Sequence, residues 1–204
     1  MYRLVHNSHM SQGRPLEFDP QLALYKAMEV FWCRGYEATS LQDLLTAMAI
    51  SKSSFYQAFG SKHALFERCL TLFRERQVGA MRAALERSPS GKAFIRQMLQ
   101  SAAKEACSGA PPRGCLIMNT ATEFSGRDAI IADLVGQGAE QFAGVFRTAI
   151  ERAQAAGEIA QDKDAELLGR YVVTTMSGLK TMAKAGMPAP AIDQVAELAL
   201  AALA

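Results

Sequence analysis

Apolar residues recur at intervals of three and four along most of this chain, and residues that start and stop helices separate the periodic segments. The first such segment begins at Asp19-Pro20, a capping side chain followed by a proline in the first turn, and it stops at Gly35. No run alternates between apolar and polar residues as a half-buried strand does. We therefore expect an all-α protein of about nine helices.

Similar capping and breaking signals predict the later helices. They place a short second helix after Thr39 or Ser40, a third from Ser51 to about Gly60, a long fourth from Ser61 to about Arg87, a fifth ending at Ala106, and four more at about 114–123, 127–156, 162–185 and 190–203.

The composition is that of a globular protein in water, with 204 residues, 50% of them hydrophobic and 21% charged. No stretch is long and apolar enough to span a membrane, and the N-terminus lacks a signal-peptide pattern, so we expect a cytoplasmic protein. Residues 1–12 are expected to be a disordered tail or an upstream extension, 13–60 a first domain and 61–204 a second.

Histidines and cysteines exclude several kinds of site. The histidines are His6, His9 and His63, too few and too far apart for a multi-histidine metal site in the body of the chain. The four cysteines, at positions 33, 69, 107 and 115, form no CxxC pair and no disulfide framework. We expect no metal and no cofactor, and most enzyme classes lose support.

Positive charge is concentrated in one stretch of the chain. Residues 51–92 hold 8 basic and 3 acidic side chains, a net charge of +5, whereas the whole chain has a net charge of only +2. A polyanionic partner is therefore expected to bind near this stretch.

Residues 39–59, TSLQDLLTAMAISKSSFYQAF, have the spacing of a helix-turn-helix. A helix of about nine residues is followed by a tight turn at Ala49-Ile50 and by a second helix that Ser51 caps. The apolar residues of both helices must pack together, which leaves short hydroxyl and amide side chains on the outer face of the second helix. Such side chains can reach base edges in the major groove of DNA.

Residues 13–66 resemble the N-terminal domain of the tetracycline-repressor (TetR) family of transcriptional regulators. The family pattern of a threonine before the second helix, then V-S-K-G-[TS]-[LF]-Y-x-[HY]-F-x-[SN]-K-x-x-L, is matched at Thr39, Ile50, Ser51, Lys52, Ser54, Phe55, Tyr56, Phe59, Ser61, Lys62 and Leu65. Ala49 stands where the family usually has glycine, and Gln57-Ala58 replaces a frequent His-His or Tyr-His pair, so the preferred base sequence cannot be copied from relatives.

The resemblance implies a double-stranded DNA operator as partner. Tyr56 and Lys62 are expected to contact the DNA backbone, and Thr39 and Ser40 to bring hydroxyl and N–H groups to a phosphate. Lys52, with its neighbours, is a candidate for reading bases, although it can instead hold a phosphate. The expected DNA-binding residues are Thr39, Ser40, Ser51, Lys52, Ser53, Ser54, Tyr56, Gln57 and Lys62.

The resemblance also implies that the last two long helices form a homodimer. Two apolar stripes have helical spacing there: Leu168, Val172, Thr175, Leu179 and Met182, and Ile192, Ala196, Ala199 and Leu203. These stripes can face a second copy of the chain, the chain's own core, or both.

A small-molecule effector is the other partner that the resemblance implies. The segment PPRGCLIMNTATEF, 111–124, follows a tight turn and resembles a stretch in one subset of the family, which includes members that sense electrophiles or oxidants by cysteine. The expected helix start and Arg113 both favour a thiolate at Cys115, whereas a cysteine on an apolar helix is often inert. The expected pocket residues are Phe94, Met98, Cys115, Met118, Asn119, Glu123, Tyr171 and Met176.

The favoured interpretation is thus a ligand-responsive dimeric regulator, most simply a repressor, with thiol-based sensing through Cys115 as the alternative. A helical enzyme with Cys115 as nucleophile is a remote alternative, because Glu123 would have to serve as its base. A helical adaptor that does not bind DNA would leave the pattern from Thr39 to Lys62 unexplained.

Overall fold

The computed structural model describes residues 18–106, 111–124 and 126–203. All the regular elements in these ranges are helices: α1 (Pro20–Arg34), α2 (Leu41–Met48), α3 (Lys52–Phe59), α4 (Lys62–Arg87), α5 (Gly91–Ala106), α6 (Leu116–Phe124), α7 (Ala129–Ala155), α8 (Ala165–Lys184) and α9 (Ala189–Ala201). The predicted all-α fold is confirmed, and the tail expected at 1–12 lies outside the described residues.

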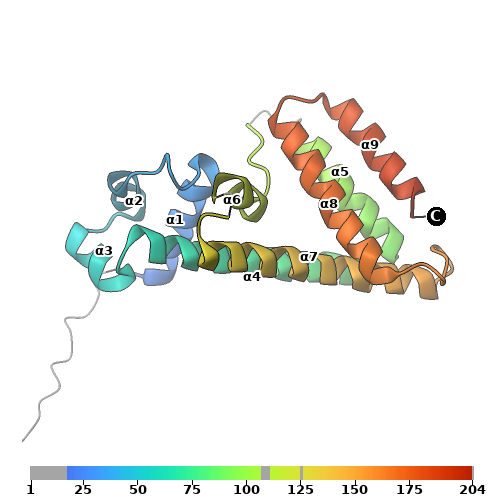
Figure 1. The fold of residues 1–204 in the computed structure, drawn as a ribbon, viewed down its shortest axis with the longest axis horizontal. Helices are drawn as coiled ribbons and strands as arrows, with labels where there is room; N and C mark the ends of the chain where they lie inside the picture. Colours follow the sequence, from blue (N-terminus) through green and yellow to red (C-terminus); the bar gives the residue numbers. More distant parts are fainter. Residues whose placement is uncertain (1–17, 107–110, 125, 204) are drawn as a thin grey trace, which may run out of the picture.

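Figure 1 shows an elongated molecule with α1–α3 at one end and a bundle of α5, α8 and α9 at the other. The long helices α4 and α7 pack against each other and run between the two ends. Helix α6 lies beside α4 and α7 between the ends of the molecule. No described helix is long and apolar enough to cross a membrane.

The N-terminal helices pack around a cluster of aromatic rings. The rings of Phe31 and Phe66 meet edge to face with centroids 4.9 Å apart, and Tyr36 lies at the same distance from Phe66. Phe55 and Phe59 bury the inner face of α3. The first turns of α4 therefore pack with α1–α3, which we call the N-terminal unit, and the same helix continues to α7 and the rest of the chain.

Ala49 adopts the left-handed conformation at the turn between α2 and α3, with φ 57° and ψ 45°. Its N–H closes the end of α2 by donating to the carbonyls of Leu45 and Thr46. A left-handed alanine costs about 1 kcal/mol or more because its Cβ approaches the following carbonyl oxygen. Ala49, which stands where the family usually has glycine, therefore strains the backbone at this turn.

The two C-terminal stripes face the chain's own core. Val172 and Leu179 on α8 are buried, and so are Ile192, Ala196 and Leu203 near the C-terminus. All the residues expected at the dimer surface lie in the described part of the chain. Among them, Met182 is the one large apolar side chain that is exposed. The neighbouring arc of each helix is apolar and exposed instead, with Leu167 62% and Leu198 70% exposed.

Candidate DNA-binding face and the cavity behind it

The outer face of α3 carries the polar side chains expected to meet DNA. Lys52, Ser53, Tyr56 and Gln57 are exposed, and Ser54 is half-buried. Tyr56 is 48% exposed, and its ring rests edge-on against Phe55, which is buried. Because α3 contacts the rest of the protein mainly through its buried face and α4, this outer face is free to enter a groove.

A cluster of three hydroxyls closes the N-terminus of α3. Ser51 Oγ accepts the N–H of Ser54 at 3.1 Å, and its oxygen lies 2.9 Å from Ser53 Oγ and 2.9 Å from Ser54 Oγ. Capping is therefore the role that the structure gives to Ser51. Ser51 and Ser53 are exposed in this cluster, whereas Ser54 is half-buried.

Thr39 and Ser40 both make hydrogen bonds within the protein. Thr39 is fully buried, and its hydroxyl donates to the carbonyl of Gly35 at 2.6 Å. Ser40 forms a capping box with Asp43: the N–H and hydroxyl of Ser40 donate to Asp43 Oδ2, and Asp43 N–H donates to Ser40 Oγ. The Thr39 side chain is therefore inaccessible to DNA, which corrects that expectation, whereas Ser40 is exposed at the N-terminus of α2 and its contact with a phosphate stays a prediction.

The hydrogen bonds from Ser40 lower the pKa of the Asp43 carboxyl, with the nearby guanidinium of Arg34 as a smaller cause. Asp43 is thus ionised at neutral pH, and its charge would repel a phosphate at the start of α2.

Lys62, in the first turn of α4, is half-buried, and its ammonium lies 4.1 Å from the centre of the Tyr36 ring. This cation–π contact holds the side chain close to the α1–α2 turn. The charge of Lys62 thus lies against the turn that follows α1, and its contact with the DNA backbone stays a prediction.

A small cavity of about 40 Å³ lies behind this unit, between α4, α7, α8 and the start of α6. It is lined by Gln77, Met81, Gly114, Cys115, Phe142, Val173, Met176, Ser177 and Lys180. A larger hollow of about 430 Å³ lies along α4 and α7, but it is an open groove bordered by the charged side chains of Arg82, Glu86 and Arg147. The small cavity is the better candidate for an apolar ligand.

Two of the eight expected pocket residues, Cys115 and Met176, line this cavity. The other six do not. Phe94 is buried against Phe146 with ring centroids 5.7 Å apart, Met98 and Met118 pack against the core, and the Tyr171 hydroxyl points to the Ala199 carbonyl at 3.5 Å.

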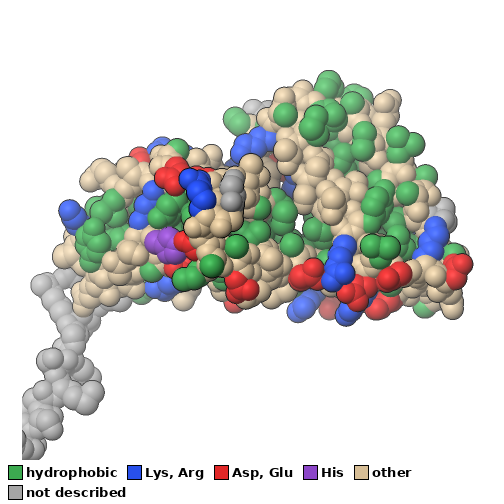
Figure 2. All heavy atoms as spheres, in the orientation of Figure 1, with side chains coloured by type: hydrophobic (Ala, Val, Ile, Leu, Met, Phe, Trp, Pro, Cys, Tyr) green, Lys and Arg blue, Asp and Glu red, His purple; other side chains and the backbone are tan. Residues whose placement is uncertain are grey.

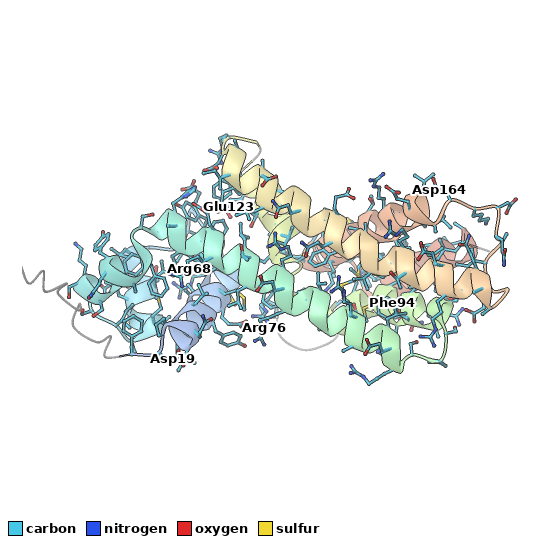
Figure 3. The ribbon with its side chains drawn as sticks, turned by 90° about the horizontal axis from the view of Figure 1, so that it is seen from below. Asp19, Arg68, Arg76, Phe94, Glu123 and Asp164 are labelled. Atoms are coloured by element: carbon cyan, nitrogen blue, oxygen red, sulfur yellow. The ribbon has the colours of Figure 1, made fainter. Side chains whose placement is uncertain are left out.

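Asn119 and Glu123, expected to orient a ligand, hold the protein's own backbone instead. Asn119 donates to the carbonyl of Arg113 at 2.8 Å. Glu123 accepts the N–H of Tyr36 at 3.0 Å and the N–H of Glu37 at 2.7 Å. Glu123 therefore fixes the end of α6 to the turn between α1 and α2 (Figure 3).

Glu123 is also a poor base for a Cys115 enzyme. The two residues lie at opposite ends of α6, about 12 Å apart along the helix axis at 1.5 Å per residue. Both carboxylate oxygens of Glu123 already accept backbone N–H groups.

Cys115 lies directly before the first residue of α6, where the N–H groups of Met118 and Ile117 reach its thiol. Burial raises the pKa of this thiol and outweighs those N–H groups and the nearby ammonium of Lys180. Arg113 does not help, because its guanidinium stacks on Trp32 at 3.8 Å and pairs with Glu29 at 2.7 Å. The expected thiolate is thus disfavoured in this conformation.

The polar wall of the cavity contains an ion pair that sequence reasoning missed. Lys180 Nζ lies 3.0 Å from Glu105 Oε2, and Glu105 Oε1 accepts the N–H groups of Arg113 and Gly114. Burial raises the pKa of Glu105, but these hydrogen bonds and the Lys180 charge outweigh it and leave the pKa below its ordinary value. Neither Lys180 nor Glu105 was among the pocket residues expected from the sequence, although Met176, four residues before Lys180 on α8, was.

Comparisons with known proteins agree with this geometry. Residues 23–69 match the family described as bacterial regulatory proteins, tetR family, and residues 91–198 match the tetracyclin repressor-like C-terminal domain. The regulator YezE of Bacillus subtilis is 34% identical over 173 residues, which are 84% of this chain and 89% of YezE. The repressor ComR of Escherichia coli is 29% identical, over 91% of this chain and 89% of ComR.

A solved structure also matches along nearly the whole chain. It is a cysteine-substituted variant of the TetR family regulator CifR bound to a 26 bp double-stranded operator, with 33% identity and a TM-score of 0.78, covering 94% of this chain and all of that chain. The helix-turn-helix predicted from the sequence thus belongs to a fold that is seen on DNA.

Proposed function

Because this chain belongs to the TetR family of bacterial regulatory proteins, we propose that it is a dimeric repressor that leaves its operator when a small molecule enters the cavity beside Cys115. The observation that carries the DNA-binding part is the outer face of α3, where Lys52, Ser53, Tyr56 and Gln57 are exposed on a helix whose other face is buried. The CifR structure, with operator DNA, supports the same mode of binding.

On this proposal Gln57 and Ser53 read base edges in the major groove, and Tyr56 and Lys62 hold phosphates. Lys52 stands at the first position of α3 and can serve either role. Ser51 and Ser54 support the interface through the capping cluster rather than by direct contact.

The exposed apolar arc of α8 and α9 is the proposed dimer face. Its large side chains are Leu167, Tyr171, Met182, Val195 and Leu198. Figure 2 shows hydrophobic side chains distributed over this part of the molecule. A two-fold dimer places two α3 helices on half-sites of a palindromic operator about 34–36 Å apart, or a multiple of that distance.

The effector acts by selecting a more open arrangement of helices. A cavity of about 40 Å³ is far below the several hundred Å³ that typical small-molecule pockets occupy. A ligand must therefore separate α4, α7 and α8 as it enters. Because α4 begins at the N-terminal unit and α6 is fixed to that unit by Glu123, this separation moves α3 out of register with the DNA.

The cavity walls suggest the chemical class of this effector. Met81, Phe142, Val173 and Met176 supply apolar surface, and Lys180 and Ser177 supply hydrogen-bond donors. A mainly apolar molecule with one or two acceptor groups fits this lining.

Thiol-based sensing is a second candidate, favoured by the position of Cys115 in the cavity wall at the start of α6. Two of the cysteines replaced in the CifR variant are eight positions apart in its own numbering, and Cys107 and Cys115 have the same separation here. Since burial raises the pKa of the Cys115 thiol, opening of the cavity would have to precede reaction.

The test is selection of bound duplexes from a random library by the purified chain, followed by titration of the selected duplex at several salt concentrations. We expect a palindromic sequence, a steep loss of affinity with salt, and weaker binding to all sequences for Lys62→Ala. A flat salt dependence, or unchanged affinity for Lys62→Ala, would rule out the proposed binding mode.

Two variants then separate the sensing mechanisms, with release from the selected duplex as the readout. Met176→Trp fills the cavity and should reduce the response to noncovalent effectors. Cys115→Ser should abolish release by oxidants and electrophiles only if sensing uses this thiol, and Cys33→Ser, at an exposed cysteine, is the matched control. If oxidants still release the Cys115→Ser variant from the duplex, sensing through Cys115 is ruled out, and the noncovalent mechanism is the one that remains.

A further inference from the structure

His63 lies between two carboxylates at the junction of the N-terminal unit and α7. Its Nδ1 is 2.7 Å from Glu67 Oε1, and its Nε2 is 2.6 Å from Asp128 Oδ2. Glu67 is one turn further along α4, whereas Asp128 caps the N-terminus of α7 through its other oxygen, which accepts the N–H groups of Ile130 and Ile131. The imidazole therefore connects the first turns of two long helices.

Both contacts can be hydrogen bonds only when the ring carries two protons. A neutral imidazole has one N–H donor and one lone pair, and a carboxylate has acceptors only. Either neutral tautomer would place a lone pair against a carboxylate oxygen at about 2.7 Å. The two distances thus favour an imidazolium at His63.

The surrounding charges favour the same state. Glu67 faces the ring from α4, and the ammonium of Lys62 lies over the neighbouring Tyr36 ring. The charges of Glu37 and Glu123 act on Tyr36, whose ring meets His63 edge to face. Arg127, between α6 and α7, donates to the carbonyls of Glu123 and Phe124 and thus closes the end of α6. With Asp128, the junction has four carboxylates and two permanent cations, so a proton on His63 reduces its net negative charge.

Burial of the ring lowers the pKa of His63, but the hydrogen bonds and charges of Asp128 and Glu67 outweigh it and raise the pKa above its ordinary value. Burial raises the pKa of Tyr36, whose ring meets His63 edge to face, and the charges of Glu37, Asp128 and Glu123 add to the rise, so Tyr36 stays neutral. His63 is therefore the group at this junction whose ordinary pKa lies nearest to neutral pH, and its two carboxylate neighbours raise that pKa.

We propose that His63 is a positioning residue for DNA binding, whose proton fastens the first turn of α4, next to Lys62, to the first turn of α7. This inference rests on the proposed function, since it assigns a consequence to DNA binding by α3 and Lys62. When the proton leaves, one of the two contacts is lost, and the start of α4 is released from α7. The fastening is fully present at low pH and is lost as the pH rises through the raised pKa of His63.

The first measurement needs no DNA. In a chain that carries His6→Gln and His9→Gln, His63 is the only histidine, and NMR of labelled imidazole gives its titration midpoint and protonation state. We expect a midpoint above the ordinary value of about 6.5, and a lower midpoint in Asp128→Asn. An asparagine keeps the acceptor that caps α7 but presents an amide donor to the ring, which favours neutral imidazole.

The matched control is Asp164→Asn, because Asp164 caps α8 in the same way through the N–H groups of Glu166 and Leu167. This variant should leave the His63 midpoint unchanged. A midpoint at or below about 6.5 in the chain with Asp128 intact would overturn the proposal whatever the DNA results are.

The second measurement is affinity for the selected duplex between pH 6 and pH 9, read by fluorescence anisotropy at constant salt. Affinity of the unaltered chain should fall as the pH rises, by about tenfold if DNA binding raises the midpoint by one unit. His63→Gln should bind weakly with little pH dependence, and His63→Lys, which keeps a cation at every pH in this range, should restore tight binding without the pH dependence.

The same pH dependence in His63→Gln as in the unaltered chain would overturn the proposal. Failure of the proposed function looks different: no duplex is selected or bound at any pH, while the raised His63 midpoint and its loss in Asp128→Asn remain.

Discussion

The outer face of α3 and the outer arc of α8 and α9 are both exposed, but they are built for different surroundings. The first is polar and belongs to a helix of eight residues whose inner face is buried through Phe55 and Phe59. The second is apolar and belongs to longer helices that pack against α5 and α7. A polar face can be covered by water until DNA replaces it, whereas a large exposed apolar patch is costly in a monomer and indicates permanent association.

The largest expected effects come from introducing a carboxylate on α8, on its buried side in one variant and on its exposed apolar side in another. Leu179→Glu places a carboxylate in the core, where Leu179 is 3% exposed, and should cost about 4 kcal/mol or more, enough to unfold much of the protein. Leu167→Glu, at a residue 62% exposed, should change the stability of the monomer by about 0.5 kcal/mol or less.

Denaturant unfolding and light scattering measure the two outcomes. We expect Leu167→Glu to give a folded monomer with poor operator affinity, because the proposed dimer face is interrupted. A dimer that persists in Leu167→Glu would show that the apolar arc of α8 and α9 is not the interface.

This contrast also shows why the sequence predicted one region better than the other. In residues 39–59 the apolar positions occupy a narrow arc, so Phe55 and Phe59 had to point inward and Gln57 outward. On α8 apolar residues cover a wide arc, and both Val172 and its neighbour Tyr171 fit a hydrophobic surface. Periodicity predicted these helices well but could not say which side meets a second copy.

The effector cavity was predicted least well, for a related reason. Its walls come from four elements that are distant in the sequence. Cys115 was named for its chemistry, and Met176 was named only as one of several apolar residues that could line a pocket. Glu123 was expected to contact a ligand because it shares a helical spacing with Cys115, Met118 and Asn119 in the segment 111–124. Its partners are backbone N–H groups of the α1–α2 turn, which no side-chain pattern reveals.

Base reading by α3 is the next largest expected effect. Gln57→Ala should lose about 1–3 kcal/mol of discrimination at one base position if the amide makes a bidentate contact, with little change in salt dependence. Gln42→Ala, on the exposed face of α2, is the matched control and should leave the base preference unchanged. Competition among duplexes that differ at single positions measures both, and an unaltered profile for Gln57→Ala would remove this residue from the reading face.

The contact between α6 and the N-terminal unit should have a smaller effect. Glu123→Gln replaces one of two carboxylate acceptors by an amide donor that faces a backbone N–H, and should cost about 1–2 kcal/mol in the fixing of the α1–α2 turn. Hydrogen exchange at the amides of Tyr36 and Glu37 measures this directly.

Operator affinity of Glu123→Gln should fall by a similar factor, because the N-terminal unit is then held less firmly. The control Glu37→Gln changes an exposed carboxylate and leaves the backbone N–H bond to Glu123 in place. If exchange at Tyr36 and Glu37 is equally slow in both variants, Glu123 does not hold the turn.

The smallest expected effect concerns the turn that sets the angle between α2 and α3. Ala49→Gly relieves the left-handed alanine but gives the unfolded chain more freedom, so the net gain in stability should be about 1 kcal/mol or less. Ala58→Gly, inside α3, should instead lose about 0.5–1 kcal/mol, since no strain is relieved there. Thermal unfolding measures both changes in stability, which should have opposite signs. Operator affinity should stay unchanged in Ala49→Gly, because the alanine and glycine turns share one backbone conformation; destabilisation by this substitution would mean that Ala49 is not strained in solution.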